Sequence, residues 1–507
     1  MLADLASGFA ALLNPMVIGF AFIGLLGGII VGGLPGLTAT MAVAVLAPFT
    51  FTMAPLVGLP FLLGVYKGAI YAGSIPAILI NTPGTAAAAA TAADGNAMAR
   101  SGKARLALEI SLYASVIADL IATMVLIAVA APLATIAVSV GSAEFTLLYA
   151  IALTMVAAVS GDDMLKGLIA TTAGILVAVV GLDPMSGAQR FTFGTTALLG
   201  GISLIPLLIG MFALSEILIR AEDALSTRPA ATVKDMPKGT SISLGGLRRL
   251  MPTILRSTGI GTALGSLPGL GAEIACWVSY GVAKRMSKSP DRFGKGAPEG
   301  VAAAEAGNNA VCPAALIPMT VFGIPGDTIT AVLLGAFMAQ GLMPGPLMFS
   351  RDAETIYALF AFLIVSNVML LFLGLWAVRH MQHIVSIPNA LLYPSVAAFC
   401  FAGAYAVNNA TFDIAIMLAG GLLGYLLRKT HLPIAPFVIG ILLAPGLENA
   451  LRQTLTVSRG SLSAFVDKPS ALALLLVLLA ILAVFTVRGL RPASSPPSQN
   501  QQRGTEK

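Results

Sequence analysis

The stretch Gly33-Leu34-Pro35-Gly36-Leu37-Thr38-Ala39-Thr40 occurs a second time as Ser266-Leu267-Pro268-Gly269-Leu270-Gly271-Ala272-Glu273. Each copy is embedded in apolar sequence long enough to enter a membrane. Proline and glycine interrupt a helix there, and the backbone groups that such a break frees are costly in lipid unless they line a polar cavity or meet a ligand. The two copies therefore predict two halves of one binding site.

Composition excludes an ordinary soluble protein. Of the 507 residues, 57% are hydrophobic and 10% are charged, whereas soluble domains contain about 25% charged residues. Apolar runs of about 20 residues, the helical length that crosses a bilayer, recur at 15–34, 106–133, 145–159, 165–180, 198–219, 356–378, 414–427 and 471–487. We therefore expect an all-α polytopic membrane protein with about 10–14 transmembrane segments, some of them broken or re-entrant helices.

The net charge of +6 does not indicate nucleic acid, because the lysines and arginines lie in short loops and at helix ends. The positive-inside rule accounts for that distribution, so the lipid bilayer is the expected partner. The three cysteines, Cys276, Cys312 and Cys400, all lie in apolar sequence and are expected to be buried small hydrophobes.

A second pair of proline and glycine breaks follows the first in each half. Pro76 and Pro83 return as Pro318 and Pro325, both 242 residues later, whereas Pro35 and Pro268 are 233 residues apart. The linker between the two motifs is thus nine residues longer in the second half. Two matched pairs in the same order predict an internal repeat, although separate helix kinks would also contain proline.

Charge predicts that the two halves have opposite orientations. In the first half the linker 49–55 is uncharged and the segment after the second motif is basic, at Arg100, Lys103 and Arg105. In the second half the linker is basic, from Lys284 to Lys295, and the segment 341–354 has one arginine against two acids. Because basic loops face the cytoplasm, the pattern predicts two inverted-topology repeats with a site near the bilayer midplane.

These patterns divide the chain into four parts. We expect a first transmembrane repeat half at 1–220, a cytoplasmic connector at 221–250, a second repeat half at 251–488 and a disordered cytoplasmic tail at 489–507.

The predicted site residues lie beside the four breaks. Helix N-termini suit a substrate carboxylate, and oxygen ligands suit a hard cation such as Na⁺. The expected substrate-binding residues are Pro35, Gly36, Thr38, Lys67, Asn81, Thr82, Pro83, Gly84, Thr85, Gly269, Gly271, Pro325 and Gly326. The expected cation-coupling residues are Thr40, Glu273, Asn308, Asn309, Asp327 and Thr328.

One basic and one acidic residue, Lys67 and Asp119, lie within apolar sequence, and their roles have to be considered separately. Lys67 is the candidate counter-charge for an anionic substrate, or it snorkels to the interface. Asp119 has no motif around it, and we expect it to pair helices.

Enzyme signatures are missing, since Ser101-Gly102-Lys103-Ala104 does not complete a phosphate-binding loop and the three histidines have no metal-ligand spacing. We expect no catalytic residue and no cofactor other than Na⁺ as a coupling ion.

At these motifs the sequence resembles the large membrane subunit of the tripartite tricarboxylate transporters, the TctA family. The resemblance is carried by the segments 32–38, 71–85, 94–100, 267–272, 298–310 and 322–326. These segments cover most of residues 20–345 in family order, whereas the last 150 residues resemble the family mainly in length and hydropathy. The chain departs mildly in having Ala72 before Gly73.

The resemblance implies a multi-pass permease of the bacterial inner membrane that works with a small four-helix membrane subunit and a periplasmic solute-binding protein. It implies uptake of a carboxylate such as citrate, driven by an ion gradient, commonly Na⁺. The residues alone also allow a channel or passive pore, or an assembly subunit with no translocation path of its own.

Overall fold

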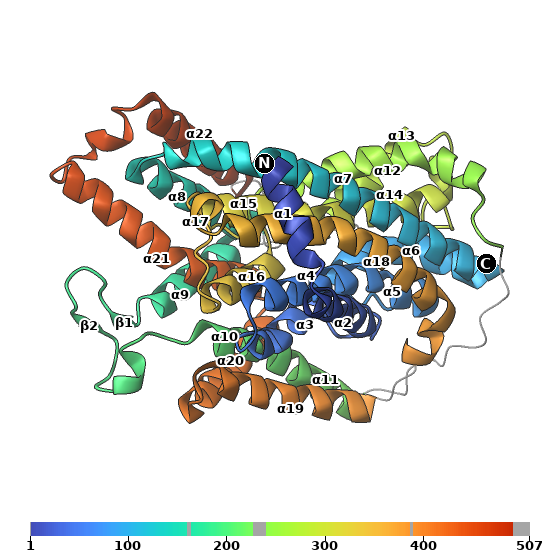
Figure 1. Cartoon of the computed structure of the whole chain (residues 1–507), viewed down its shortest axis with the longest axis horizontal. Coiled ribbons are helices and arrows are strands. Elements are labelled where there is room, and N and C mark those ends of the chain that lie inside the picture. Colours follow the sequence, from blue (N-terminus) through green and yellow to red (C-terminus); the bar gives the residue numbers. More distant parts are fainter. Residues whose placement is uncertain (1, 160–163, 227–239, 386–388, 490–507) are drawn as a thin grey trace, which may run out of the picture.

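The computed structural model describes residues 2–159, 164–226, 240–385 and 389–489, and most of this described chain is helical (Figure 1). The helices of the first half are α1 (Leu2–Leu12), α2 (Pro15–Gly32), α3 (Ala39–Leu46), α4 (Pro55–Ala72), α5 (Ser74–Ile80), α6 (Ala89–Met98), α7 (Ala104–Val138), α8 (Ser142–Val159), α9 (Met164–Ala178), α10 (Leu204–Leu208) and α11 (Ser215–Ser226). A short antiparallel hairpin, β1 (Gly181–Leu182) and β2 (Gln189–Arg190), follows α9. A π-helical segment, η5 (Ile209–Leu214), joins α10 to α11.

The second half begins after the connector. Its helices are α12 (Leu244–Gly265), α13 (Gly271–Met286), α14 (Pro298–Ala314), α15 (Leu316–Phe322), α16 (Thr328–Ala339), α17 (Met348–Arg351), α18 (Ala353–Val385), α19 (Asn389–Asn408), α20 (Thr411–Lys429), α21 (Ile434–Val457) and α22 (Pro469–Gly489). Because α11 ends at Ser226 and α12 begins at Leu244, helix extends into both ends of the expected connector. Residues 227–239 of that connector and residues 490–507 of the expected disordered tail lie outside the described residues.

The all-α polytopic fold is confirmed. Within the described residues, eight helical stretches are long and apolar enough to cross a membrane, and five shorter helices are also apolar. The eight are Pro15–Gly32, Pro55–Ile80, Ala86–Val138, Leu204–Glu222, Ala353–His380, Leu391–Asn408, Thr411–Lys429 and Ile434–Val457. The three cysteines are free and buried, as expected.

The second proline and glycine pair produces the same local structure in both halves. Helices α5 and α15 each have seven residues and begin 242 residues apart. The residue that follows each helix, Asn81 after α5 and Gly323 after α15, has the left-handed conformation, with φ of 57° and 67°. Such a residue closes a helix because its N–H can reach back to an unpaired carbonyl. The repeat in sequence is therefore also a repeat in backbone structure.

The first pair of breaks also matches. Helix α2 ends at Gly32 and α12 ends at Gly265, and the turns that follow contain Gly36 and Gly269 with φ of 87° and 84°. Glycine adopts this left-handed backbone without the steric penalty of a side chain. Within each half, the two breaks contact each other. Gly84 of the second break lies against Gly32 at the end of α2, and Gly326 lies against Gly265 at the end of α12.

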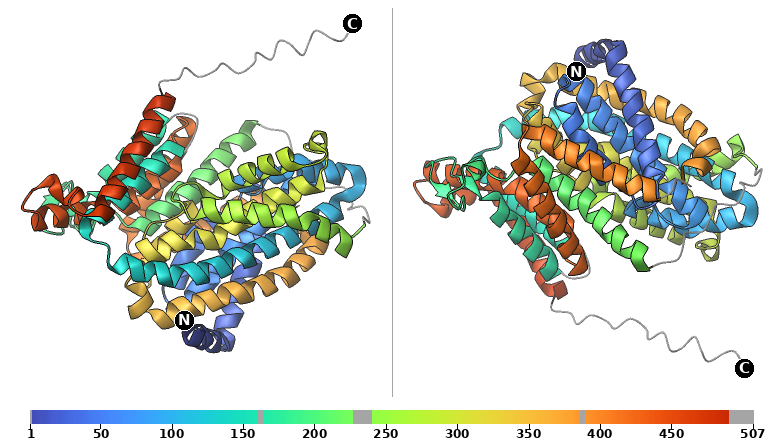
Figure 2. Two further views of the ribbon diagram at one scale, coloured as in Figure 1. Left: turned by 90° about the horizontal axis from the view of Figure 1, so that it is seen from above. Right: turned by 90° about the horizontal axis from the view of Figure 1, so that it is seen from below.

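Two long helices interlock the halves. Helix α7 of the first half packs on α12 and α14 of the second, and α18 of the second half packs on α2 and α4 of the first. In Figure 1 both run across the middle of the molecule. Helices α8, α9, α21 and α22 pack together to one side, as Figure 2 shows in teal and red, and α10, α11, α19 and α20 form another group with η5. Each group thus contains helices from both halves.

One segment differs from its expected local structure. The first basic stretch, expected as a loop, is helical from Ala89 through the π-helical turn Ala99–Lys103 and bends at Gly102, with φ of 80°. Asp94 is fully buried there, and its Oδ1 accepts hydrogen bonds at 2.8 Å from the backbone N–H groups of Gly294, Gly296 and Ala297. The carboxylate therefore anchors the basic linker of the second half to α6 of the first.

Candidate functional site

A cavity of about 520 Å³ lies where the four helix breaks meet. Predicted residues from every break line it: Thr38, Thr40, Thr85, Gly269, Gly271, Glu273, Asp327 and Thr328. The remaining wall is largely apolar and includes Ile70, Phe212, Ile439 and the connection between α20 and α21. Segments that are more than 200 residues apart in sequence therefore form one polar chamber in an apolar setting.

Direct contacts join the breaks. The N–H of Gly269, in the first break of the second half, donates to the carbonyl of Gly326 in the second break, at 2.8 Å. The hydroxyl oxygens of Thr40 and Thr328, which come from different halves, are 3.3 Å apart. The backbone and side chains of one break thus fix the position of another.

Three of the helices that begin at the cavity directly follow a break. Thr38 caps α3, and its hydroxyl accepts a hydrogen bond from the N–H of Met41 at 3.2 Å. Helix α13 begins at Gly271 and α16 at Thr328. The first turns of helices carry unpaired N–H groups and partial positive charge, which attract anions. The cavity therefore combines the backbone chemistry that binds carboxylates with hydroxyl and carboxylate oxygens.

Asp327 has a structural role in this arrangement. Its Oδ1 accepts hydrogen bonds from the N–H of Thr330 at 2.7 Å and from the Thr330 hydroxyl, and Tyr66 donates to Oδ2 at 3.2 Å. The carboxylate thus caps α16 and links it to α4. Glu273 lies in the first turn of α13 and also lines the cavity, so two carboxylates from the second half border the chamber.

The structure places Lys67 away from the cavity lining. Its ammonium lies 2.6 Å from the carboxylate of Asp119 and donates to Ser366 Oγ and the Leu363 carbonyl, at 2.6 and 3.0 Å. Both charged side chains are about 2% exposed. Lys67 therefore neither faces the chamber nor snorkels to the surface; with Asp119 it joins α4 to α7 and α18. The expectation that Asp119 pairs helices agrees with this contact.

Asn308 and Asn309 are also buried away from the cavity lining. Asn309 donates to Ser115 Oγ at 2.8 Å and to the carbonyl of Glu305 at 3.1 Å, and the Glu305 carboxylate accepts from Thr91 and Ser115. Neither amide atom of Asn308 has a hydrogen-bond partner among the described residues. Asn309, Glu305, Ser115 and Thr91 thus form a buried polar cluster that joins α14 to α7 and α6.

The other predicted residues shape the breaks without lining the chamber. Asn81 supplies the left-handed end of α5, and the N–H of Thr82 bonds to the Pro76 carbonyl at 3.3 Å. Six further residues give the breaks their turns and close packing: Pro35, Gly36, Pro83, Gly84, Pro325 and Gly326.

Sequence reasoning missed Arg428, at the end of α20, which lines the cavity. Its guanidinium pairs with Glu216 of α11, and Glu216 also accepts a hydrogen bond from Arg220 Nε at 2.9 Å. Arg220 lies over the first break, since a Cβ built on Gly36 would be 3.1 Å from its Nε. The available signal was Glu216, a carboxylate inside an expected span, because such a group requires a partner.

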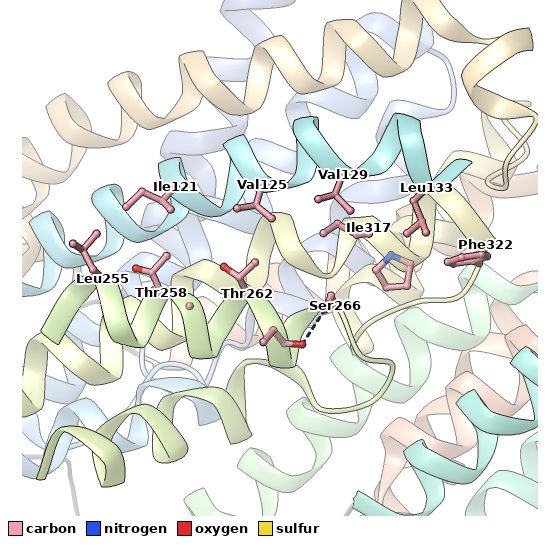
Figure 3. Close-up of a pocket in the computed structure, with 13 residues that line it drawn as sticks. Ile121, Val125, Val129, Leu133, Leu255, Thr258, Thr262, Ser266, Ile317 and Phe322 are labelled. Atoms are coloured by element: carbon pink, nitrogen blue, oxygen red, sulfur yellow. Dashed lines mark hydrogen bonds between the residues drawn. The ribbon is translucent and has the colours of Figure 1, made fainter. Parts of the chain in front are cut away.

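A second cavity, of about 540 Å³, lies between α7, α12 and α15 and has a different character (Figure 3). Apolar side chains of α7, from Ile121 to Leu133, line one side. The hydroxyls of Thr258 and Ser266 are bonded to carbonyls of their own helix, at 2.8 and 2.9 Å. No charged side chain lines this groove among the described residues, whereas Glu273, Asp327 and Arg428 line the first cavity.

Comparison with known proteins gives one family and two relatives. The family model of the tripartite tricarboxylate transporter TctA family matches residues 18–439. A protein of Agrobacterium vitis described as "Uncharacterized 52.8 kDa protein in TAR-I ttuC' 3'region" is 36% identical over 491 residues, 97% of each chain. A second, described as "Uncharacterized protein in TAR-II ttuC' 3'region" from the same organism, is 37% identical over 215 residues, 42% of this chain and 89% of its own.

No solved structure matches the chain. The family match includes all four helix breaks and the connection that contributes Arg428, and the first relative aligns over nearly the whole length. The repeated breaks, the cavity between them and these matches agree: this multi-pass membrane protein belongs to the tripartite tricarboxylate transporter TctA family.

Proposed function

We propose that the chain is the large permease subunit of a secondary transporter that imports a carboxylate, either a tricarboxylate such as citrate or a dicarboxylate, with a Na⁺ or H⁺ gradient as the driving force. The observation that carries this proposal is that residues from all four helix breaks line one cavity. Secondary transporters built from internal repeats bind substrate and coupling ion between broken helices. Family membership supports the general role in transport.

The chemistry of the cavity matches both solutes. A carboxylate would lie near the first turns of α3, α13 and α16, where free N–H groups provide donors. A hard cation would use oxygens of Thr40, Thr328 and Glu273, all of which line the chamber. The same Glu273 carboxylate would instead carry the proton if H⁺ is the coupling ion.

Inverted orientation of the halves is supported by the position of the basic segments. Asp94 lies just before the basic stretch of the first half, and it bonds to Gly294 and Gly296 in the basic linker of the second half. Two segments that are not repeat equivalents thus lie at the same end of the molecule, as the positive-inside rule requires of inverted halves. The end that carries them would face the cytoplasm.

The remaining components follow from the family. We infer that the permease lies in the bacterial inner membrane and works with a small four-helix membrane subunit and a periplasmic solute-binding protein that delivers the carboxylate. Two rival functions make different predictions: a channel or passive pore, and an assembly subunit without a translocation path.

Reconstitution separates these functions. Proteoliposomes containing both membrane subunits receive binding protein loaded with labelled citrate or succinate, under an imposed Na⁺ gradient or pH gradient. A secondary transporter accumulates label above the external concentration and loses it when the gradient is collapsed, whereas a channel only equilibrates it. Glu273→Gln in an intact complex should abolish accumulation; unchanged accumulation would favour a path that lies outside this chain.

A further inference from the structure

Among the described residues that line the chamber, one side chain is positively charged and could pair with an anionic substrate. Among the described residues, the charged side chains that line it are Glu273, Asp327 and Arg428. Asp327 is committed to the start of α16 and to Tyr66. A carboxylate that enters this space meets two negative side chains, so it needs a positive partner beyond the helix N-termini.

We propose that Arg428 binds a carboxylate group of the substrate and that Glu216 is the partner which the substrate replaces. This inference rests on the proposed function and assigns its substrate-binding residue. A guanidinium presents a planar set of donors that matches a carboxylate, whether that carboxylate belongs to Glu216 or to a ligand. The two acceptors therefore compete for the same donors.

The surroundings make the exchange feasible. The side chain of Arg428 is 30% exposed, whereas that of Glu216 is 7% exposed, so the arginine is the partner that a ligand can reach. Glu216 retains Arg220 on its own helix, at 2.9 Å, when Arg428 changes partner. The buried carboxylate is then not left without a cation, which is the costly outcome when a buried pair is broken.

A neighbouring ion pair keeps the two helices together during the exchange. Lys429 lies 2.6 Å from Glu222, and the hydroxyl of Tyr425 donates to Glu222 at 3.0 Å. These contacts join α20 to α11 beside the Arg428 and Glu216 pair, at the next residue of α20 and six residues further along α11. They lie outside the cavity lining, so Lys429 provides a matched control: the adjacent residue of the same helix, with the same charge and the same partner helix.

Equilibrium binding of labelled citrate and succinate to the purified membrane subunits tests the proposal, with the binding protein omitted because it would hold carboxylate itself. Arg428→Gln should weaken the tighter-binding probe about tenfold or more, since it removes a charge-assisted hydrogen bond. Glu216→Gln should strengthen it severalfold, because the competing carboxylate is lost. Lys429→Gln should leave binding unchanged.

Opposite effects of Arg428→Gln and Glu216→Gln would show that Arg428 binds the substrate. If the two residues formed only a structural ion pair, both variants would weaken binding. The proposal is overturned if Arg428→Gln behaves like Lys429→Gln, or if Glu216→Gln and Arg428→Gln weaken binding equally. In either case wild-type binding and uptake would leave the transport function standing. Absence of wild-type binding to both probes would overturn the carboxylate assignment itself, and this inference with it. Size-exclusion profiles of all variants exclude misfolding as the cause.

Discussion

The hydroxyl oxygens of Thr40 and Thr328 lie 3.3 Å apart, although 288 residues separate them in sequence. One belongs to the first turn of α3 and the other begins α16, so the contact joins the first break of one half to the second break of the other. Both line the cavity. The pair therefore marks the point at which the two repeats share one chamber.

Replacing either threonine by valine keeps the shape and removes one oxygen. If both oxygens bind the coupling ion, Thr40→Val and Thr328→Val should each raise the ion concentration for half-maximal uptake about tenfold, because a lost buried polar contact costs about 1–3 kcal/mol. The double variant should be less than additive, since the two sites touch. Uptake measured against Na⁺ concentration and pH checks this. Thr135→Val, whose hydroxyl bonds only within α7, should have no effect.

The Lys67 and Asp119 pair should contribute to stability and not to substrate affinity. Removing one partner leaves a buried charge, so Lys67→Met or Asp119→Leu should each destabilise the protein by about 3–5 kcal/mol. The double variant should recover most of that loss, because neither charge remains. Thermal unfolding in detergent measures the effect. Equal loss in the double and single variants would show that the pair is not coupled.

The glycine stripe of α2 should tolerate no side chain. A methyl group at Gly24, Gly28 or Gly32 would overlap backbone carbonyls of α4, whereas one at Gly27 meets nothing within 4 Å. Gly28→Ala should therefore cost about 1–3 kcal/mol through overpacking, and Gly27→Ala should be neutral. The yield of folded protein and its unfolding temperature compare the two variants. Similar values would mean that α2 and α4 are not packed closely there.

Asp94 should hold the basic linker in place. Asp94→Ala removes the acceptor of three backbone N–H groups, so it should cost about 1–3 kcal/mol and expose the linker. Asp94→Asn retains one carbonyl oxygen and should have a smaller effect. Limited trypsin digestion between Lys284 and Lys295 reports the exposure. If both variants are cut at the wild-type rate, the anchor is not needed.

The sequence indicates those features that depend on local chemistry. Proline and glycine break helices wherever they occur, so the four breaks and their repeat offsets could be predicted from Pro35, Pro83, Pro268 and Pro325. Hydropathy likewise predicts the all-α membrane fold. Eight of the predicted site residues line one chamber, because break residues in lipid must have polar partners. Their roles in binding stay predictions.

The remaining features depend on which helices meet. Lys67 looks like a counter-charge until α7 brings Asp119 to it. Arg428 looks like a charge at a helix end, since nothing nearby in sequence shows that α20 ends beside the breaks. Asn308 and Asn309 look like cation ligands in the sequence, yet both are buried and neither lines the chamber. Such assignments require the packing of helices that are far apart in the chain.

The most direct test of the central claim, that the four breaks form the carboxylate site, is substrate protection of a single introduced cysteine. The native cysteines are buried, so Thr328→Cys provides the thiol in the cavity and Ser289→Cys, in the exposed linker, provides the control. The labelling rate with a charged thiol reagent is measured with and without the transported carboxylate. Binding in the chamber predicts slower labelling at position 328 and an unchanged rate at position 289. Equal rates at position 328 with and without a carboxylate that the complex transports would contradict the account.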